Sequence, residues 1–245
     1  MQRLLRYIAW LFASLASSSP APAHADPQPP PYARVFDLVF QPGWQASLGD
    51  TSLKFRIFDA GQLRVLSGRI KACDPFVGMQ HKPFTPMVPE GDFKVRLALV
   101  DGGIDDRRVA LARVDFSFEP AVRWEMAVTE GQDIATLKDG EHFGYPVDAG
   151  TGSFVDAATA AVAAQRMAAD EGITQRWIAL GEKSASAKSA PNFYANIDLG
   201  PGNIVMFQSG WGDGLYASWF GYDAQGRIAA LITDFNVVDW ATAKW

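Results

Sequence analysis

The sequence has only one cysteine, Cys73, among its 245 residues. A single thiol cannot form an internal disulfide, so the fold must be held together by its apolar core. Basic residues are also scarce, because 22 Lys and Arg stand against 27 Asp and Glu, giving a formal net charge of -5. Nucleic acids and anionic membranes attract basic surfaces, so this composition argues against both as partners.

Familiar catalytic motifs are missing as well. The sequence contains no P-loop, no H-E-x-x-H and no C-x-x-C. Ser209 lacks the glycine two positions earlier that a nucleophile elbow requires. Cys73 could act as a nucleophile with His81 or His142 as its base, but a lone cysteine is more typically a small buried apolar residue. No catalytic class follows from motifs alone.

Long apolar runs are absent except near the amino terminus. Arg3 and Arg6 precede a ten-residue apolar run at 7–16, and the small-residue sequence AHA follows at 23–25. These are the three parts of a secretory signal peptide, with cleavage predicted after residue 25. Ten residues are too few to span a bilayer. We therefore expect an exported protein, periplasmic or extracellular, with no stable membrane insertion after cleavage.

The remaining chain has enough apolar residues for one packed domain, since 48% of the sequence is hydrophobic. We expect three parts, namely a signal peptide at 1–25, a Pro-rich spacer at 26–34 and a single globular domain at 35–245. Alternating apolar and polar positions predict short strands in that domain. The expected strands are 53–59, 63–72, 92–100, 108–118, 121–128, 203–208, 215–221 and 227–233.

One main helix is expected at 156–171, where Asp156 can cap the amino end and Ala-rich sequence favours helix. A second, shorter helix is expected at 173–180. The consecutive strands 92–100, 108–118 and 121–128 predict an antiparallel meander. The expected fold is therefore a β-rich α+β domain with antiparallel meander sheets and one main helix.

Four aspartates at turns are the candidate catalytic or metal-binding residues: Asp74, Asp148, Asp213 and Asp234. Carboxylates at strand ends could converge on one rim, where they could bind Ca²⁺ or Mg²⁺ or act as general acid and base. The alternative is structural, because aspartate is favoured in turns through hydrogen bonds to nearby backbone. Apart from such a divalent cation, the sequence indicates no cofactor.

Candidate binding residues come from two segments. The run Gly150 to Ser153 leads toward the predicted helix, so its N–H groups could meet an anion at the helix start, or it could simply form a tight loop. Aromatic residues crowd the 211–222 hairpin, where they could form an exposed platform for sugars or peptides, or could be core. The candidate binding residues are Gly150, Thr151, Trp211, Gly212 and Trp219.

Several segments, taken together, resemble a bacterial family known as domain of unknown function 4241. The segments are 68–75, 122–127, 143–152, 209–214 and 233–235, and the resemblance runs from about residue 50 to about residue 240. The resemblance implies one domain across this span and no particular activity. It marks as motif positions Asp74, Asp148, Gly150, Thr151, Trp211, Gly212, Asp213 and Asp234.

Three functions remain open at this point. A non-catalytic binding module for a protein or small-molecule ligand fits the lack of catalytic motifs and the aromatic hairpin. A hydrolase that uses converging aspartates, with or without Ca²⁺ or Mg²⁺, would require those carboxylates to line one cleft. A protein that neutralises a secreted toxin is supported by the acidic net charge alone.

Overall fold

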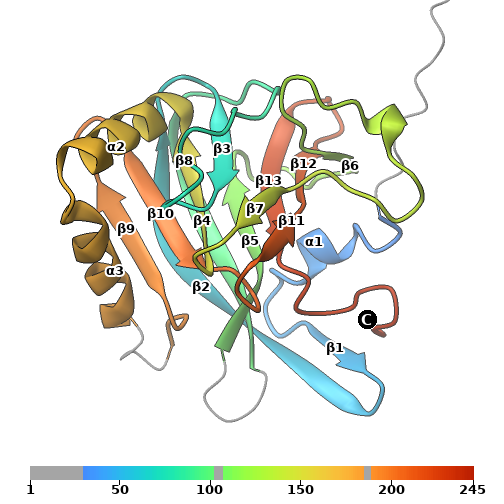
Figure 1. Ribbon diagram of the computed structural model, residues 1–245. Coiled ribbons are helices and arrows are strands. Elements are labelled where there is room, and N and C mark those ends of the chain that lie inside the picture. Colours follow the sequence, from blue (N-terminus) through green and yellow to red (C-terminus); the bar gives the residue numbers. More distant parts are fainter. Residues whose placement is uncertain (1–29, 102–106, 185–188) are drawn as a thin grey trace, which may run out of the picture.

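The computed structural model describes residues 30–101, 107–184 and 189–245, which form two main antiparallel sheets (Figure 1). In spatial order, the seven-stranded sheet contains β1 (Gln45–Leu48), β2 (Thr51–Val65), β4 (Gly91–Asp101), β5 (Arg107–Asp115), β13 (Ile228–Asp234), β12 (Ser218–Tyr222) and β6 (Arg123–Met126). The four-stranded sheet contains β3 (Ile70–Cys73), β8 (Thr151–Asp156), β10 (Asn203–Gln208) and β9 (Tyr194–Asp198). A small pair is formed by β7 (Tyr145–Val147) and β11 (Gly214–Tyr216).

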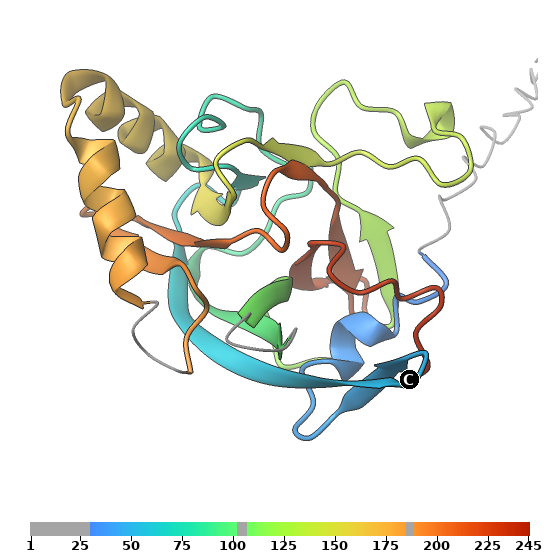
Figure 2. The ribbon, with the colours of Figure 1, turned by 60° about the horizontal axis from the view of Figure 1, so that its bottom comes forward.

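Helices cover the outer faces of the two sheets. The helices α2 (Ala157–Ala169) and α3 (Ile173–Lys183) pack against the four-stranded sheet (Figure 1). The short helix α1 (Val35–Leu38) lies on the other side of the molecule, with β2, β5 and β6 of the seven-stranded sheet arranged around it (Figure 2). A 3-10 turn, η1 (Ile134–Thr136), belongs to the long connection between β6 and β7. The predicted β-rich α+β fold is confirmed.

Three apolar clusters hold these layers together. The inter-sheet core lies between the two sheets and includes Leu97, Phe154 and Phe220. The helix-side core joins α2 and α3 to the four-stranded sheet. The α1 core fills the opposite face of the seven-stranded sheet and includes Phe36 and Trp219. Both faces of the central strands are therefore buried, which explains their nearly continuous apolar sequences.

The crossing between sheets differs from the prediction. The expected strands 53–59 and 63–72 are not separated at residues 60–62: the register shifts there in a β-bulge between Asp59 and Gln62, and β2 continues unbroken to Val65. The predicted strand at 63–72 instead breaks at Gly68, whose φ of 67° lets the chain turn into the other sheet. The break between strands therefore lies at Gly68 and not at residues 60–62.

The predicted three-strand meander is correct only in part. The strands β4 and β5 are neighbours, but β13 and β12 lie between β5 and β6 in the sheet. The inserted hairpin has buried residues on both faces, which suits the middle of a sheet better than an edge. Strands from the carboxyl-terminal part of the chain therefore lie inside the largest sheet, between β5 and β6.

The main helix is confirmed, and Asp156 does more than cap it. One carboxylate oxygen accepts hydrogen bonds from the N–H groups of Ala158 and Thr159, the first turn of α2. The other accepts from the N–H groups of Leu66 and Ser67 and from the Ser67 hydroxyl. A single buried side chain thus fixes the helix start and the crossover between sheets. The expected short second helix is α3.

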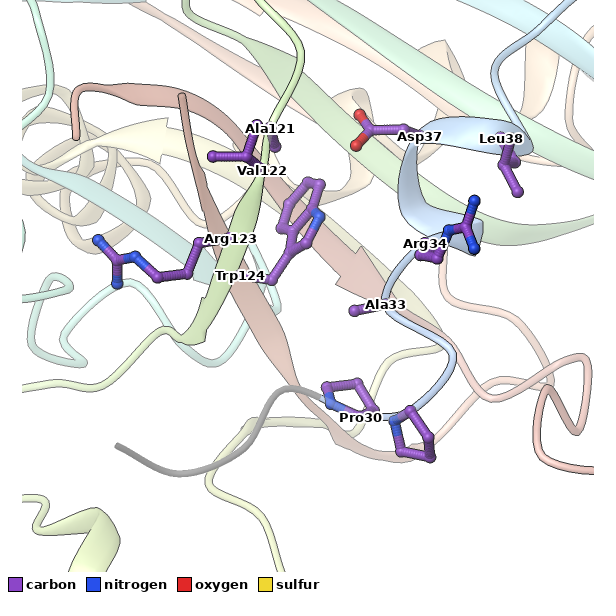
Figure 3. A pocket seen from close by; sticks show the side chains of 10 residues that line it. Pro30, Ala33, Arg34, Asp37, Leu38, Ala121, Val122, Arg123 and Trp124 are labelled. Carbon is purple, nitrogen blue, oxygen red and sulfur yellow. The ribbon is translucent and has the colours of Figure 1, made fainter. Parts of the chain in front are cut away.

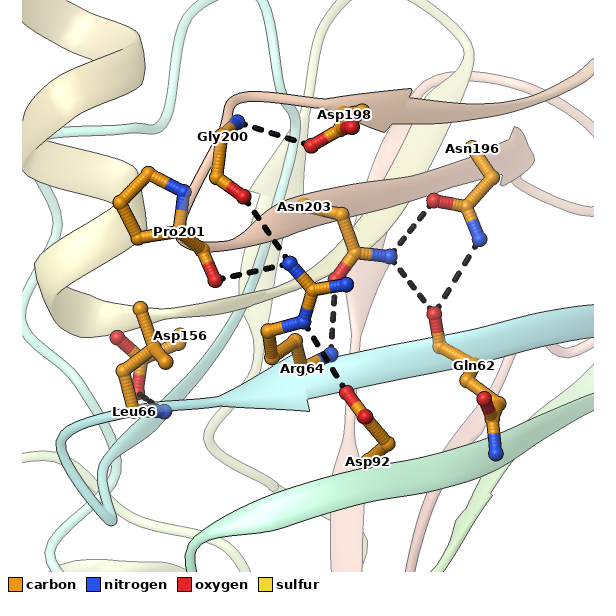
Figure 4. Close-up of polar contacts among 10 residues, drawn as sticks. All are labelled: Gln62, Arg64, Leu66, Asp92, Asp156, Asn196, Asp198, Gly200, Pro201 and Asn203. Carbon is orange, nitrogen blue, oxygen red and sulfur yellow. Dashed lines mark hydrogen bonds and ion pairs between the residues drawn. The ribbon is translucent and has the colours of Figure 1, made fainter.

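A polar network joins the two sheets along one edge (Figure 4). Arg64 on β2 donates to the carbonyl oxygens of Gly200 and Pro201 at 3.0 and 3.1 Å, in the turn between β9 and β10. The side-chain amide of Asn203 accepts from the backbone N–H of Arg64 at 2.8 Å and donates to the Gln62 carbonyl at 2.7 Å. Since these bonds run from one sheet to the other, they fix the angle at which the sheets pack.

The last residues of the predicted spacer contact the folded domain. Ala33 is buried and Tyr32 packs edge-on against Phe36, although both belong to the predicted spacer. The predicted signal peptide and the first spacer residues lie outside the described ranges. Within those ranges, no helix has both the length and the apolar character needed to cross a bilayer.

Candidate functional site

Asp74 anchors a loop from the end of β3. Its side chain is fully buried, and one carboxylate oxygen accepts from the N–H groups of Asp148 and Ala149 at 3.0 and 2.7 Å. The other oxygen accepts from the N–H of Phe76 at 2.9 Å. Three backbone donors compensate the buried charge, so this carboxylate is a structural acceptor.

Asp213 holds the same loop from the opposite side. Its carboxylate accepts from the N–H of Gly150 at 3.1 Å, and the Gly150 carbonyl accepts from the N–H of Ser209 at 3.1 Å. The two aspartates and the backbone of 148–150 together form what we call the loop clamp. The structure therefore brings Asp74, Asp213 and the Asp148 backbone together, while the Asp148 side chain is exposed.

The loop clamp supports a tight turn at 209–213, which we call the Trp211 turn. The N–H of Gly212 donates to the Ser209 carbonyl at 2.7 Å, and the Gly212 carbonyl accepts from the Tyr216 hydroxyl at 2.8 Å. Trp211 projects from this turn with 60% of its surface exposed. The Arg108 guanidinium lies 4.7 Å from the centre of one Trp211 ring, a cation–π contact that steadies the indole.

The glycines at 150 and 152 do not form a helix-start anion site. Residues from Thr151 onward form β8, and α2 begins only at Ala157 behind the cap of Asp156. Thr151 is buried and donates its hydroxyl proton to the Ala149 carbonyl at 3.1 Å. Gly152 is required by close packing, because a Cβ there would lie 3.0 Å from the Tyr145 hydroxyl oxygen. Gly150 and Thr151 thus shape the loop clamp from within.

Trp219 is not part of an exposed platform. It is buried on β12 and its ring centre lies 6.2 Å from that of Phe36 in the α1 core. Tyr216 and Phe220 lie in the inter-sheet core, on the other side of the seven-stranded sheet. The hairpin aromatics are therefore mostly core, and Trp211 is the one that is strongly exposed among the described hairpin aromatics.

Asp234 occupies a different environment from the loop clamp. It is 3% exposed at the end of β13, and its Oδ1 accepts from the N–H of Asn236 at 2.9 Å. Its Oδ2 is buried and has no hydrogen-bond partner among the described residues. Burial raises the pKa of Asp234 to about 7. The Trp240 indole N–H faces the carboxyl and moderates that rise, although the geometry falls short of a hydrogen bond.

A pocket of about 530 Å³ opens beside Asp234, which we call the Asp234 pocket. Its walls include Tyr32 from the amino-terminal segment, His142 from the β6–β7 connection, and Trp219 and Asn236. The Nε2 of His142 is also buried and has no partner among the described residues. Asp74, Asp148 and Asp213 do not line this pocket, so the four candidate carboxylates do not share one cleft.

This separation bears on the expected cation site. In residues 30–101, 107–184 and 189–245, no three His, Cys, Asp or Glu side chains are grouped closely enough to hold a metal ion. Cys73 is fully buried, and burial raises the pKa of its thiol to about 11. A thiolate nucleophile at that position is therefore strongly disfavoured.

Two further pockets contain charged side chains, and ion pairs within the protein involve several of them. One, of about 470 Å³, lies across the amino-terminal segment from the Asp234 pocket and is lined by Arg34, Asp37 and Trp124 (Figure 3). The other, of about 750 Å³, runs along Arg96 and Arg113. Arg113 pairs with Asp37 at 2.7 Å, and both arginines pair with Asp115 at 2.6 Å, so their charges are compensated.

Sequence reasoning missed Tyr32, His142 and Asn236 as walls of the Asp234 pocket. Their separations along the chain carry no motif, because three distant segments meet there. The only local signal is at Asn236, whose φ of 53° is the one left-handed value at a non-glycine residue in the described ranges. Asparagine tolerates this conformation better than most residues, but a single asparagine does not identify such a turn from sequence.

Comparison with known families matches residues 63–233 to the family described as protein of unknown function (DUF4241). The match spans the crossover, the four-stranded sheet, the strands of the seven-stranded sheet from β4 onward, the loop clamp and the Trp211 turn. It ends one residue before Asp234. No significant match was found among curated proteins or among solved structures.

Proposed function

Since the chain belongs to the DUF4241 family, whose function is unknown, we propose its role from its own geometry: it is an exported, non-catalytic binding module that contacts its partner through the Trp211 turn. The observation that carries this proposal is the exposure of Trp211 on a turn that the fold holds rigidly. A large exposed indole on a fixed backbone offers contact area at a small cost in conformational entropy.

The contacts of the loop clamp favour a binding role over a catalytic role for this region. All four oxygen–donor contacts described for Asp74 and Asp213 go to backbone N–H groups. These bonds commit both carboxylates to holding backbone in and around the loop clamp, which is a structural use of their oxygens. Their effect is to fix the position of Trp211 and its neighbour Arg108, residue types that dominate many binding interfaces.

The binding test compares two exposed aromatic residues. Purified protein is screened on a glycan array and a peptide array, and hits are measured by titration calorimetry with Trp211→Ala and Phe118→Ala variants. Phe118 is the matched control because it is fully exposed elsewhere on the surface. We expect Trp211→Ala to weaken binding by about tenfold or more and Phe118→Ala to leave it unchanged. Equal losses in both variants would refute a specific role for the Trp211 turn.

Export is the second part of the proposal, and the features of residues 1–25 support it. Expression of the full sequence in a bacterial host, followed by fractionation and intact-mass measurement, tests it directly. We expect the product outside the cytoplasm with a mass that lacks residues 1–25. A variant with Ala23→Arg and Ala25→Arg should retain the leader, because the peptidase requires small residues there. A full-length wild-type product in the cytosol would contradict export.

Hydrolysis stays as a second candidate because of Asp234. A buried carboxylic acid with a pKa of about 7 is suited to general acid catalysis near neutral pH. His142 lines the same pocket and could act as its partner base. Assays with nitrophenyl esters, phosphates and glycosides test this candidate. Turnover that disappears in both Asp234→Asn and His142→Ala would favour hydrolysis over binding.

A further inference from the structure

The Asp234 pocket has the size and wall chemistry of a small-ligand site. Its volume of about 530 Å³ falls within the usual range for pockets that hold small organic molecules. Apolar walls come from Trp219, Met126 and Leu137, and the aromatic ring of Tyr32 closes one side. A ligand with an apolar body would therefore be largely removed from water there.

One polar group in this pocket lacks its counterpart. The Oδ2 atom of Asp234 is buried without a hydrogen-bond partner among the described residues, although the Trp240 indole N–H faces the carboxyl, whereas Oδ1 is held by the backbone N–H of Asn236. No ion pair described for this structure includes Asp234. A buried carboxylate with an empty acceptor position is costly unless a donor fills that position. The backbone N–H of Asn236, which lies in a left-handed turn, holds the carboxylate in place.

The charges around the pocket favour a cation over an anion. Asp139 and Glu141 lie at its wall beside Lys138, and Asp239 lies close enough, with Asp234, to raise the pKa of Tyr32. The basic side chain of Lys138 is exposed, and the backbone N–H of this residue donates to the Glu141 carboxylate at 2.9 Å. Negative groups thus outnumber positive ones, which attracts cations to the opening.

We propose that the Asp234 pocket binds a small organic cation, an ammonium or amidinium group carried on an apolar body. The cationic group donates to Asp234 Oδ2, and the rings of Trp219 and Tyr32 contact the body of the ligand and attract its charge. The buried Nε2 of His142 can accept a second hydrogen bond when the imidazole is neutral. This site is separate from the Trp211 turn, so the two proposals stand or fall independently.

Three probes of nearly equal size test the charge requirement. They are 2-phenylethylamine, which is a cation, 2-phenylethanol, which is neutral, and phenylacetate, which is an anion. Binding is measured by titration calorimetry at pH 8 and pH 6. We expect the amine to bind at least about tenfold more tightly than either analogue at pH 8. We expect its affinity to fall by about fivefold to tenfold at pH 6, because Asp234 is then mostly protonated.

Two isosteric variants make the test specific. Asp234→Asn should remove both the preference for the amine and its pH dependence. Asp213→Asn removes the same charge at the loop clamp and should change neither. Asp234→Asn is expected to fold, because the wild-type side chain is already partly neutral near pH 7. Tyr32→Leu, as a second pocket variant, should weaken amine binding severalfold while keeping its pH dependence.

The results that would overturn the proposal are equally definite. They include equal binding of amine and alcohol, undetectable amine binding at millimolar concentration, and unchanged amine binding in Asp234→Asn. Tighter binding of the alcohol or the anion at pH 6 would show instead that the protonated acid serves as a hydrogen-bond donor.

Discussion

Asp74 and Asp234 are both buried aspartates at the ends of strands, yet they differ in the number of donors that reach them. Three backbone N–H groups bind Asp74, whereas one binds Asp234. Asp74 lies in packed structure, and Asp234 lies beside an open pocket. The difference teaches that burial of a carboxylate does not distinguish a structural role from a binding role. What distinguishes the two roles is whether the protein itself supplies enough hydrogen-bond donors to the carboxylate.

The same substitution at the two positions gives the strongest test of this difference. Asp74→Asn replaces one acceptor oxygen with an amide N–H₂ group that must face other donors. We expect a loss of at least about 3 kcal/mol in the free energy of unfolding, since buried unsatisfied groups of this kind are costly. Urea denaturation at pH 7 measures it. A loss below about 1 kcal/mol would show that the loop clamp contributes little to stability.

Asp234→Asn should act in the opposite direction, and its effect should depend on pH. The folded pKa of Asp234, about 7, lies above its ordinary value near 4, so the folded state prefers the acid. Wild-type stability from this group is therefore full below about pH 4 and is lost as the pH rises through 7. The variant lacks this loss.

We therefore expect the stability of Asp234→Asn relative to wild type to increase by roughly 2–3 kcal/mol between pH 5 and pH 8. Urea denaturation of both proteins across that range measures the difference. A flat difference with pH would mean that Asp234 titrates normally and that its surroundings are wetter than described.

The smallest effect is expected at the exposed side of the loop clamp. Asp213→Ala removes one hydrogen bond, from the N–H of Gly150, and water can replace it because Asp213 is exposed. We expect a loss of about 0.5–1 kcal/mol in the free energy of unfolding. Thermal denaturation beside Asp74→Asn checks the ranking. An effect as large as that of Asp74→Asn would mean that both aspartates act as one unit.

Local features of the fold were predictable from sequence. The helix α2 and its Asp156 cap were expected because capping and alanine propensity act over a few adjacent residues. Alternation along a strand is equally local, and it places Phe220 in one core and its neighbour Trp219 in another. The spacing of apolar residues predicts well which face of a helix or strand is buried.

Features that depend on distant segments were not predictable. Positions 61 and 68 are both glycine, but the chain changes direction only at Gly68. The reason is that Asp156 binds the backbone of the adjacent Leu66 and Ser67. The Asp234 pocket is built from several separated segments, so the sequence indicated Asp234 without indicating its neighbours. Both cases depend on which distant segments of the chain pack together, and this cannot be read from a single sequence.

The position of β12 and β13 between β5 and β6 has a consequence for the order of assembly. During synthesis, the strands β2, β4 and β5 emerge early, but their missing neighbour β13 emerges only near the end of the chain. Contacts between such distant segments form slowly. The largest sheet therefore cannot be completed until the last strands have been synthesised, and such a delay would suit the export that we propose.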